Sequence, residues 1–243
     1  RKKYLNTGKS EHETQTANVL AIYFDLTDDI QREGAKLVKD IEECGHLKTG
    51  FVGTPYLLHA LTKIGRADLA YKLLLKKDFP SWLFPVTKGA TTMWERWNSY
   101  THKDGFGNVG MNSFNHYAYG AVGEWFFETI CGIQPSLAAD ATKAAFKEFT
   151  LAPIPGGGLT YAKATFESMN GEIRSDWKFE EEALVWSFAI PANTTAHITL
   201  PQGWDVADGD EAAKAKLASL FAGEANATAT AGEYTVVLRQ YNK

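Results

Sequence analysis

The chain has 243 residues, a formal net charge of −4 and a hydrophobic content of 44%, which permit one large domain or two ordinary ones around a substantial core. Nucleic acids and acidic membrane surfaces attract clustered Lys and Arg, so the charge argues against both as partners. No apolar run reaches the length of a membrane-spanning helix. Cys44 and Cys131 are too few for a disulfide framework, and no Cys/His spacing suggests zinc. We therefore expect two free thiols and neither a metal nor a cofactor.

The first third of the chain carries the apolar period of amphipathic helices. Four helices are expected, over residues 11–26, 28–44, 56–64 and 66–77. Thr27 is the expected cap of the second helix, and Gly45 is its expected end. Pro55 suits the first position of the third helix, because proline has no N–H to leave unsatisfied there. This part of the chain is predicted to consist of helices joined by short turns.

Residues 78–112 break this pattern, and a loop of such length in a compact domain is usually functional. The loop contains Trp94-Glu95-Arg96-Trp97, for which we predict a short helix over 92–97. A carboxylate between two indoles suits a sugar, because indoles cover the apolar C–H face of a pyranose while the carboxylate binds hydroxyls or a water. The alternative is a buried ion pair of Glu95 with an arginine, with both tryptophans in the core.

Strand patterns replace helical ones in the second half of the chain. A long helix is expected from Asn112 or Ser113 to Cys131, with Gly132 as its end. Alternating patterns then predict strands over 145–151, 159–168, 171–180, 182–190, 194–200 and 233–240. Asn170-Gly171 is a strong hairpin turn signal. The sequence therefore predicts a helical region followed by an antiparallel β-sandwich.

Six stretches resemble, in content, order and spacing, the C-terminal part of the bacterial α-L-rhamnosidases of glycoside hydrolase family 78. They include Leu-Lys-Thr-Gly-Phe-Val-Gly-Thr-Pro in residues 47–55 and Gly-Ala-Thr-Thr-Met-Trp-Glu-Arg-Trp in residues 89–97. All six lie in residues 14–21, 47–58, 67–75, 80–82, 89–97 and 111–122. The resemblance implies that residues 1–134 are the C-terminal half of an (α/α)6 toroid and that residues 135–243 are the β-sandwich that follows it.

The resemblance also implies the inverting hydrolysis of terminal α-L-rhamnosyl residues, with an L-rhamnose-containing glycan or glycoside as partner. Inversion uses a general acid and a general base, about 6.5–9.5 Å apart with a water between them. Glu95 matches the family's general base and His116 a sugar-hydroxyl contact. Trp94 and Trp97 flank the base, and we expect them to bind substrate as part of the cleft wall.

One departure from the family pattern limits this interpretation. The acidic, Asp- and Arg-rich motif that carries the family's general acid is not found in the chain. The resemblance therefore implies a fragment of a rhamnosidase, inactive alone. A non-catalytic carbohydrate-binding or structural module is the alternative function. A half-toroid would expose apolar helix faces, so self-association is expected. A bacterial origin is expected, and a periplasmic or extracellular location is favoured over a cytoplasmic one.

Overall fold

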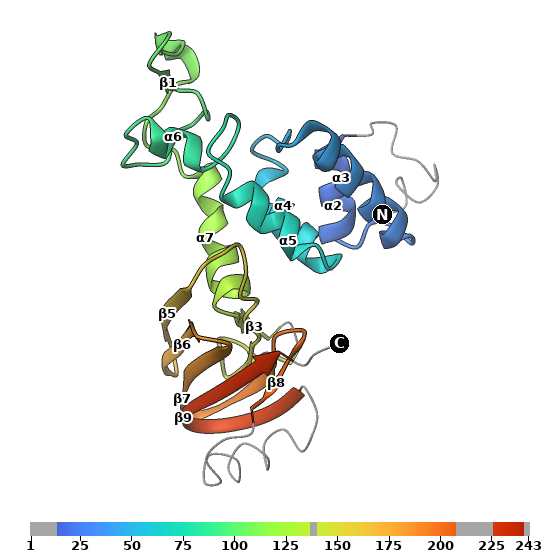
Figure 1. Cartoon of the computed structure of the whole chain (residues 1–243), viewed down its shortest axis with the longest axis vertical. Coiled ribbons are helices and arrows are strands. Elements are labelled where there is room, and N and C mark those ends of the chain that lie inside the picture. Colours follow the sequence, from blue (N-terminus) through green and yellow to red (C-terminus); the bar gives the residue numbers. More distant parts are fainter. Residues whose placement is uncertain (1–13, 137–139, 208–225, 241–243) are drawn as a thin grey trace. The chain divides into compact units, whose positions relative to one another are not determined.

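The computed structural model describes residues 14–136, 140–207 and 226–240. The chain forms two compact units, and it passes from the N-terminal unit to the C-terminal unit between Trp125 and Phe126. Helices dominate the first unit and strands the second, so the predicted fold class is confirmed (Figure 1). The assignment of residues 1–134 and 135–243 to the two family domains stays a prediction. Of the helices in the described ranges, none is long and apolar enough to cross a membrane.

The described part of the N-terminal unit contains the predicted series of helices. These are α2 (Gln15–Tyr23), α3 (Ile30–Cys44), α4 (Thr54–Lys63) and α5 (Ala67–Leu74). Gly45 ends α3 in the left-handed region, at φ +71°, as predicted. The predicted cap Thr27 is wrong: Asp29 caps α3, because its Oδ1 accepts a hydrogen bond from Arg32 N at 2.9 Å. Thr27 Oγ1 instead accepts from Asp29 N in the preceding turn.

Apolar faces join these helices into one core. α2 packs on α3 and α4, and α4 packs on α5. The buried side chains at their contacts include Val19, Ile22, Leu37, Ile41, Leu57, Leu61 and Leu69. Burying each such side chain is worth about 1.5–3 kcal/mol. Trp125, fully buried, donates from Nε1 to Thr62 Oγ1 at 3.0 Å and meets the Tyr71 ring edge-on, so this core extends to α7 (Val122–Trp125).

The segment between α5 and the C-terminal unit is less helical than predicted. It holds α6 (Leu83–Thr87), the hairpin β1 (Tyr100–Thr101) and β2 (Gly105–Phe106), and the short 3₁₀ helices η1 (Val109–Met111) and η2 (Ala118–Ala121). The predicted helix over 92–97 is absent. The predicted helix over 112–131 begins only at Ala118 and passes from 3₁₀ through α7 into a π-helix, η3 (Phe126–Ile130). Gly120 and Gly123 weaken it as an α-helix.

The C-terminal unit is built on one seven-stranded sheet. Its strands are β3 (Ile133–Pro135), β4 (Glu148–Leu151), β5 (Tyr161–Ser168), β6 (Gly171–Glu180), β7 (Ala183–Thr199), β8 (Trp204–Val206) and β9 (Asn226–Gln240). A 3₁₀ turn, η4 (Ala141–Lys143), precedes β4. The predicted hairpin joins β5 to β6, with Ser168 opposite Gly171. The pairings are antiparallel except that of β4 with β7, which is parallel and was not predicted.

One strand replaces two of the predicted ones. The strands predicted over 182–190 and 194–200 are merged in the single strand β7 (Ala183–Thr199), whose register with β9 shifts between Ile190 and Thr195. Pro191 has no N–H to offer the ladder, and Asn193 lies at φ +59°, so the strand is irregular there without ending. The two halves have different neighbours, β6 for the first half and β4 for the second.

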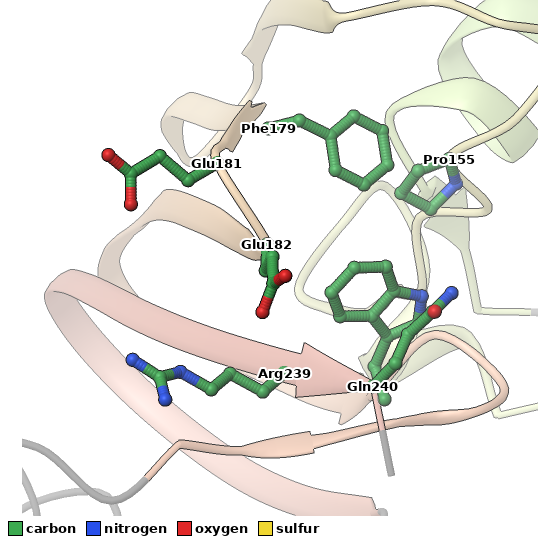
Figure 2. Close-up of a pocket in the computed structure, with 7 residues that line it drawn as sticks. Pro155, Phe179, Glu181, Glu182, Arg239 and Gln240 are labelled. Carbon is green, nitrogen blue, oxygen red and sulfur yellow. The ribbon is translucent and has the colours of Figure 1, made fainter. Parts of the chain in front are cut away.

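Side-chain hydrogen bonds attach the sheet to η3. Trp177 Nε1 donates to Ile130 O at 2.7 Å, and Ser175 Oγ donates to Cys131 O at 2.6 Å. Trp186 Nε1 in turn donates to Ser175 Oγ. All these side chains are buried, so unmade bonds would be costly. A cavity of about 690 Å³ lies where β6 and β9 end and β8 begins; Figure 2 shows its lining residues.

Candidate active site

A backbone pairing between distant segments shapes the acid-bearing loop. Glu95 N donates to Ser113 O at 2.9 Å, and His116 N donates to Met93 O at 2.8 Å. Thr92 Oγ1 adds a hydrogen bond to Phe114 O. The segment 92–95 therefore lies alongside 113–116. This pairing places Glu95 and His116, two residues selected from the sequence, on adjoining segments.

The Glu95 carboxylate is oriented by the same pairing. Its Oε2 accepts a hydrogen bond from Ser113 N at 2.8 Å. Its Oε1 forms no hydrogen bond within the described part of the chain, and the side chain is only half-buried. The predicted alternative, an ion pair of Glu95 with an arginine, is not formed with any described residue; the neighbouring Arg96 is exposed. One carboxylate oxygen is thus fixed while the other is available to solvent or a ligand.

Glu95 opens into a pocket of about 290 Å³ with aromatic walls. The pocket is lined by Gly50, Phe51, Phe79, Glu95, Arg96, Trp97, Asn98, Met111 and Tyr119. The Trp97 ring stacks on that of Tyr119, with centroids 3.7 Å apart and planes 11° apart. Trp82 packs edge-on against Trp97 and donates from Nε1 to Tyr119 O at 3.0 Å. Trp82 therefore belongs to the core and supports this aromatic wall from behind.

Tyr119 and Phe51 are pocket residues that the sequence did not single out. Burial raises the pKa of the Tyr119 phenol, so the hydroxyl stays protonated near neutral pH. The Phe51 ring lies 5.2 Å from that of Tyr119 and stacks on His116 at 5.0 Å. Both residues lie in stretches that carry the family resemblance. An aromatic between two glycines was the available signal for Phe51.

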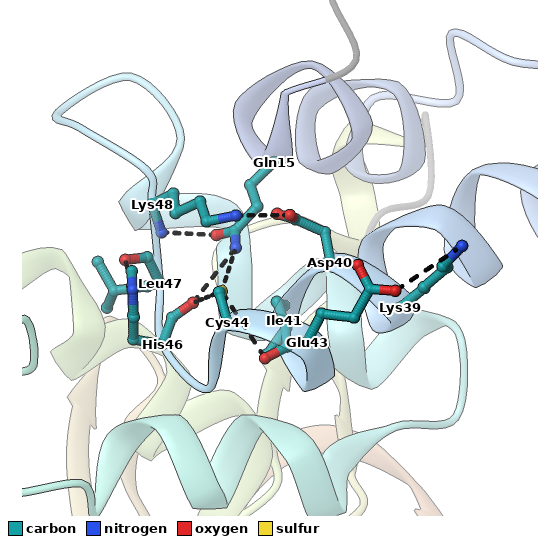
Figure 3. Close-up of polar contacts among 9 residues, drawn as sticks. All are labelled: Gln15, Lys39, Asp40, Ile41, Glu43, Cys44, His46, Leu47 and Lys48. Carbon is teal, nitrogen blue, oxygen red and sulfur yellow. Dashed lines mark hydrogen bonds and ion pairs between the residues drawn. The ribbon is translucent and has the colours of Figure 1, made fainter.

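The loop that carries Phe51 is held by polar contacts from the helices (Figure 3). Gln15 Oε1 accepts from Lys48 N at 2.7 Å, and Gln15 Nε2 donates to His46 O at 3.2 Å. Lys48 Nζ pairs with Asp40 at 2.6 Å. The amide of one buried glutamine therefore fixes the backbone on both sides of Leu47, and with it the start of the loop.

The other two predicted sugar contacts lie away from the pocket surface. Trp94 is 5% exposed and packs edge-on against Phe114. The His116 ring is half-buried against Phe51, and its Nδ1 accepts from Ala118 N at 3.3 Å. Neither lines the pocket that holds Glu95 and Trp97. Their role as substrate contacts stays a prediction.

No group of three or more His, Cys, Asp or Glu side chains in the described ranges is placed to hold a metal ion. Both cysteines are free thiols, as expected from their number. Cys131 is buried, whereas Cys44 is half-buried and donates from Sγ to His46 O.

Comparison with known proteins agrees with the resemblance read from the sequence. The family model for the bacterial alpha-L-rhamnosidase 6 hairpin glycosidase domain matches residues 1–130, and the model for the bacterial alpha-L-rhamnosidase C-terminal domain matches residues 132–214. An alpha-L-rhamnosidase of Formosa agariphila is 47% identical over 191 residues, which are 77% of this chain and 20% of that protein. One of Streptomyces avermitilis is 45% identical over 197 residues, 80% of this chain and 18% of that protein.

A solved structure of one of these relatives shows that the similarity extends to the fold. The Streptomyces avermitilis alpha-L-rhamnosidase complexed with L-rhamnose matches 94% of this chain and 22% of its own, with a TM-score of 0.80 and 36% identity. The chain thus spans about a fifth of the length of the relatives it matches. It belongs to the family of bacterial alpha-L-rhamnosidases, whose six-hairpin glycosidase domain and C-terminal domain it matches in turn.

Proposed function

We propose that Glu95 is the general base of an inverting α-L-rhamnosidase that hydrolyses terminal α-L-rhamnosyl residues of glycans or glycosides. The observation that carries the proposal is the Glu95 carboxylate in the pocket, with Oε2 held by the Ser113 N–H and Oε1 open. A general base needs a lone pair within hydrogen-bond reach of the proton it removes. A backbone donor on the other oxygen keeps that lone pair pointed in one direction.

In this reaction, Oε1 of Glu95 removes a proton from water as the water oxygen attacks the anomeric carbon. The bond to the leaving oxygen breaks on the opposite face, where a general acid supplies a proton. Among the described residues that line the pocket, Glu95 is the only carboxylic acid. We therefore propose that the acid lies outside this chain and that the chain alone is inactive.

The pocket suits a deoxy sugar. L-Rhamnose presents a methyl group and an apolar C–H face, which the rings of Trp97, Tyr119 and Phe51 can cover. Its hydroxyls can accept from Arg96 and donate to Asn98. The volume of about 290 Å³ lies at the small end of the range for ligand pockets, as a single sugar requires. The related Streptomyces avermitilis structure contains L-rhamnose, which supports this substrate.

The test is Glu95→Gln in a rhamnosidase that joins this chain to the part of the family's length that it does not span. Glutamine keeps the shape and the acceptor for Ser113 N but cannot take a proton. Release of aryl alcohol from an aryl α-L-rhamnoside should fall about 10²–10⁴-fold in kcat, with L-rhamnose affinity little changed. Glu43→Gln, on the exposed side of α3, is the matched control and should retain full activity. Full turnover by Glu95→Gln would remove Glu95 from the mechanism.

Two further measurements separate the alternatives. Proton NMR of the first product formed should show the β anomer, and an α product would exclude inversion. The chain alone should release no rhamnose; release would contradict the proposal that it lacks an acid. A carbohydrate-binding module would instead bind sugar without turnover in the joined protein, and Glu95→Gln would then change no rate.

A further inference from the structure

The C-terminal unit has a cavity of its own, separate from the pocket of Glu95. Its volume of about 690 Å³ lies within the usual range for ligand sites. Its lining comes from the end of β6, the turn into β7, β8, the end of β9 and the loop before β5. Elements far apart in sequence therefore converge on it.

Strand register places aromatic side chains at the end of the sheet core. Phe179 lies opposite Leu184, Leu184 opposite Leu238, and Trp204 opposite Gln240. Side chains alternate between faces, so Phe179 and Trp204 point to the face on which Leu184 and Leu238 are fully buried. Phe179 is nevertheless 37% exposed and Trp204 is half-buried. The inner face thus continues beyond the core as an accessible aromatic surface.

The aromatic surface has the shape of a shallow wedge. The rings of Phe179 and Trp204 have centroids 5.7 Å apart and planes inclined at 45°. Figure 2 shows the Phe179 ring directed toward Pro155. The Trp204 indole N–H donates to no residue in the described ranges. An indole with an open face and a free N–H can stack on a sugar ring and donate to one of its hydroxyls.

Polar groups beside the wedge also lack partners among the residues that the structure describes. Glu182, Arg239 and Gln240 line the cavity, and their side chains form no hydrogen bond or ion pair with other described residues. In Figure 2, Glu182 lies between Phe179 and Arg239, whereas Glu181 extends away from the ring. The two carboxylates, Glu181 and Glu182, outnumber the one guanidinium, so the net negative charge of the lining disfavours anionic ligands. Carboxylate acceptors beside a guanidinium donor instead match neutral hydroxyl groups, which both donate and accept.

We propose that this cavity is a non-catalytic binding site for a neutral pyranose sugar. The sugar's C–H face lies on Phe179 and Trp204, its hydroxyls donate to Glu182, and they accept from Arg239. The site is separate from the proposed hydrolysis at Glu95 and does not depend on it. It would hold a glycan chain to the C-terminal unit.

The indole N–H signals of the 15N-labelled full chain test the proposal directly. The chain has seven tryptophans, and Trp204→Phe identifies the signal of Trp204. L-Rhamnose, D-galactose and D-glucose are each titrated, with D-glucuronate as the anionic comparison. At least one neutral sugar should shift the Trp204 signal saturably, with glucuronate binding about tenfold more weakly. The proposal is overturned if no neutral sugar moves that signal or if glucuronate binds equally well.

Matched variants locate the effect in the cavity. Phe179→Ala and Glu182→Gln should each weaken binding about tenfold. Phe127→Ala, with a ring of similar exposure elsewhere in the unit, and Glu167→Gln on β5 should leave it unchanged. Glu182→Gln is exposed and isosteric, so it tests the site without disturbing packing. Glu95→Gln should not alter the Trp204 shift, which separates this proposal from that of hydrolysis. Equal losses in the control variants would contradict a specific site.

Discussion

Gly132 is the position at which one added methyl group should have the largest effect on the C-terminal unit. It follows η3 and precedes β3, and its φ of +77° lies in the left-handed region. A Cβ built on it would lie 2.2 Å from Pro153 N and 2.3 Å from the carbonyl carbon of Ala152. Both are backbone atoms, so no side chain can rotate to make room. Gly132→Ala therefore forces the two chain segments apart.

Two backbone hydrogen bonds join these two chain segments, and their loss contributes to the destabilisation expected in Gly132→Ala. Ala152 N donates to Gly132 O, and Ile154 N donates to Thr129 O, each at 2.9 Å. Each of these bonds is worth about 0.5–1.5 kcal/mol. The left-handed conformation costs alanine about 1–2 kcal/mol, and overpacking a close contact costs about 1–3 kcal/mol. We expect the free energy of unfolding of the C-terminal unit to fall by about 3–8 kcal/mol in Gly132→Ala.

Gly158→Ala is the matched control, because Gly158 has nearly the same φ, +75°, but nothing within 4 Å of the added Cβ. It should cost only about 1–2 kcal/mol. Urea unfolding followed through the indole N–H signals of Trp177 and Trp186 reports on the C-terminal unit alone. Equal destabilisation by the two substitutions would refute the argument from backbone contact.

Three further outcomes are expected. Phe51→Ala should weaken binding of L-rhamnose to the N-terminal pocket about two- to tenfold, measured by titration calorimetry; unchanged affinity would exclude that ring from the site. Burial lowers the pKa of His59 below 6.5, and this effect exceeds the opposite effect of the Glu124 carboxylate. The neutral His59 ring therefore stabilises the fold fully above pH 6.5, and this stabilisation is lost as the pH falls through the folded pKa. His59→Gln should flatten that slope in urea unfolding between about pH 5 and 8. Burial raises the pKa of the Cys131 thiol to about 12, so Cys44→Ser chains should react with an aromatic disulfide about a thousandfold more slowly when folded than when unfolded; equal rates would contradict this burial.

The parts of the fold that local chemistry determines could be read from the sequence. Gly45 and Gly132 end helical segments because only glycine enters the left-handed region without strain. Asn170-Gly171 joins β5 to β6 because the pair accommodates a tight hairpin turn. The helix–strand order and the family followed from such signals together with the motif resemblance.

The parts of the fold that depend on contacts between distant segments could not be predicted from the sequence. The short helix predicted over 92–97 does not form because Met93 and Glu95 bond to residues 113–116 instead of to their own neighbours. The two strands predicted around Pro191 are one because β9 pairs along both halves of β7. In both cases, a partner far away in the sequence overrides local preference.

The absence of the predicted helix over 92–97 affects the candidate active site directly. In a short helix over 92–97, the Glu95 N–H would bond locally, and the carboxylate would have no fixed donor. In the observed pairing, Ser113 N donates to Glu95 Oε2 while Ser113 O accepts from Glu95 N, so one residue holds both the backbone and the side chain of Glu95. Trp97 follows this segment and stacks on Tyr119, with ring centroids 3.7 Å and planes 11° apart. The carboxylate and the aromatic wall are thus positioned by a single pairing of segments 92–95 and 113–116, and a change that separates these segments should disturb the base and the sugar-binding surface together.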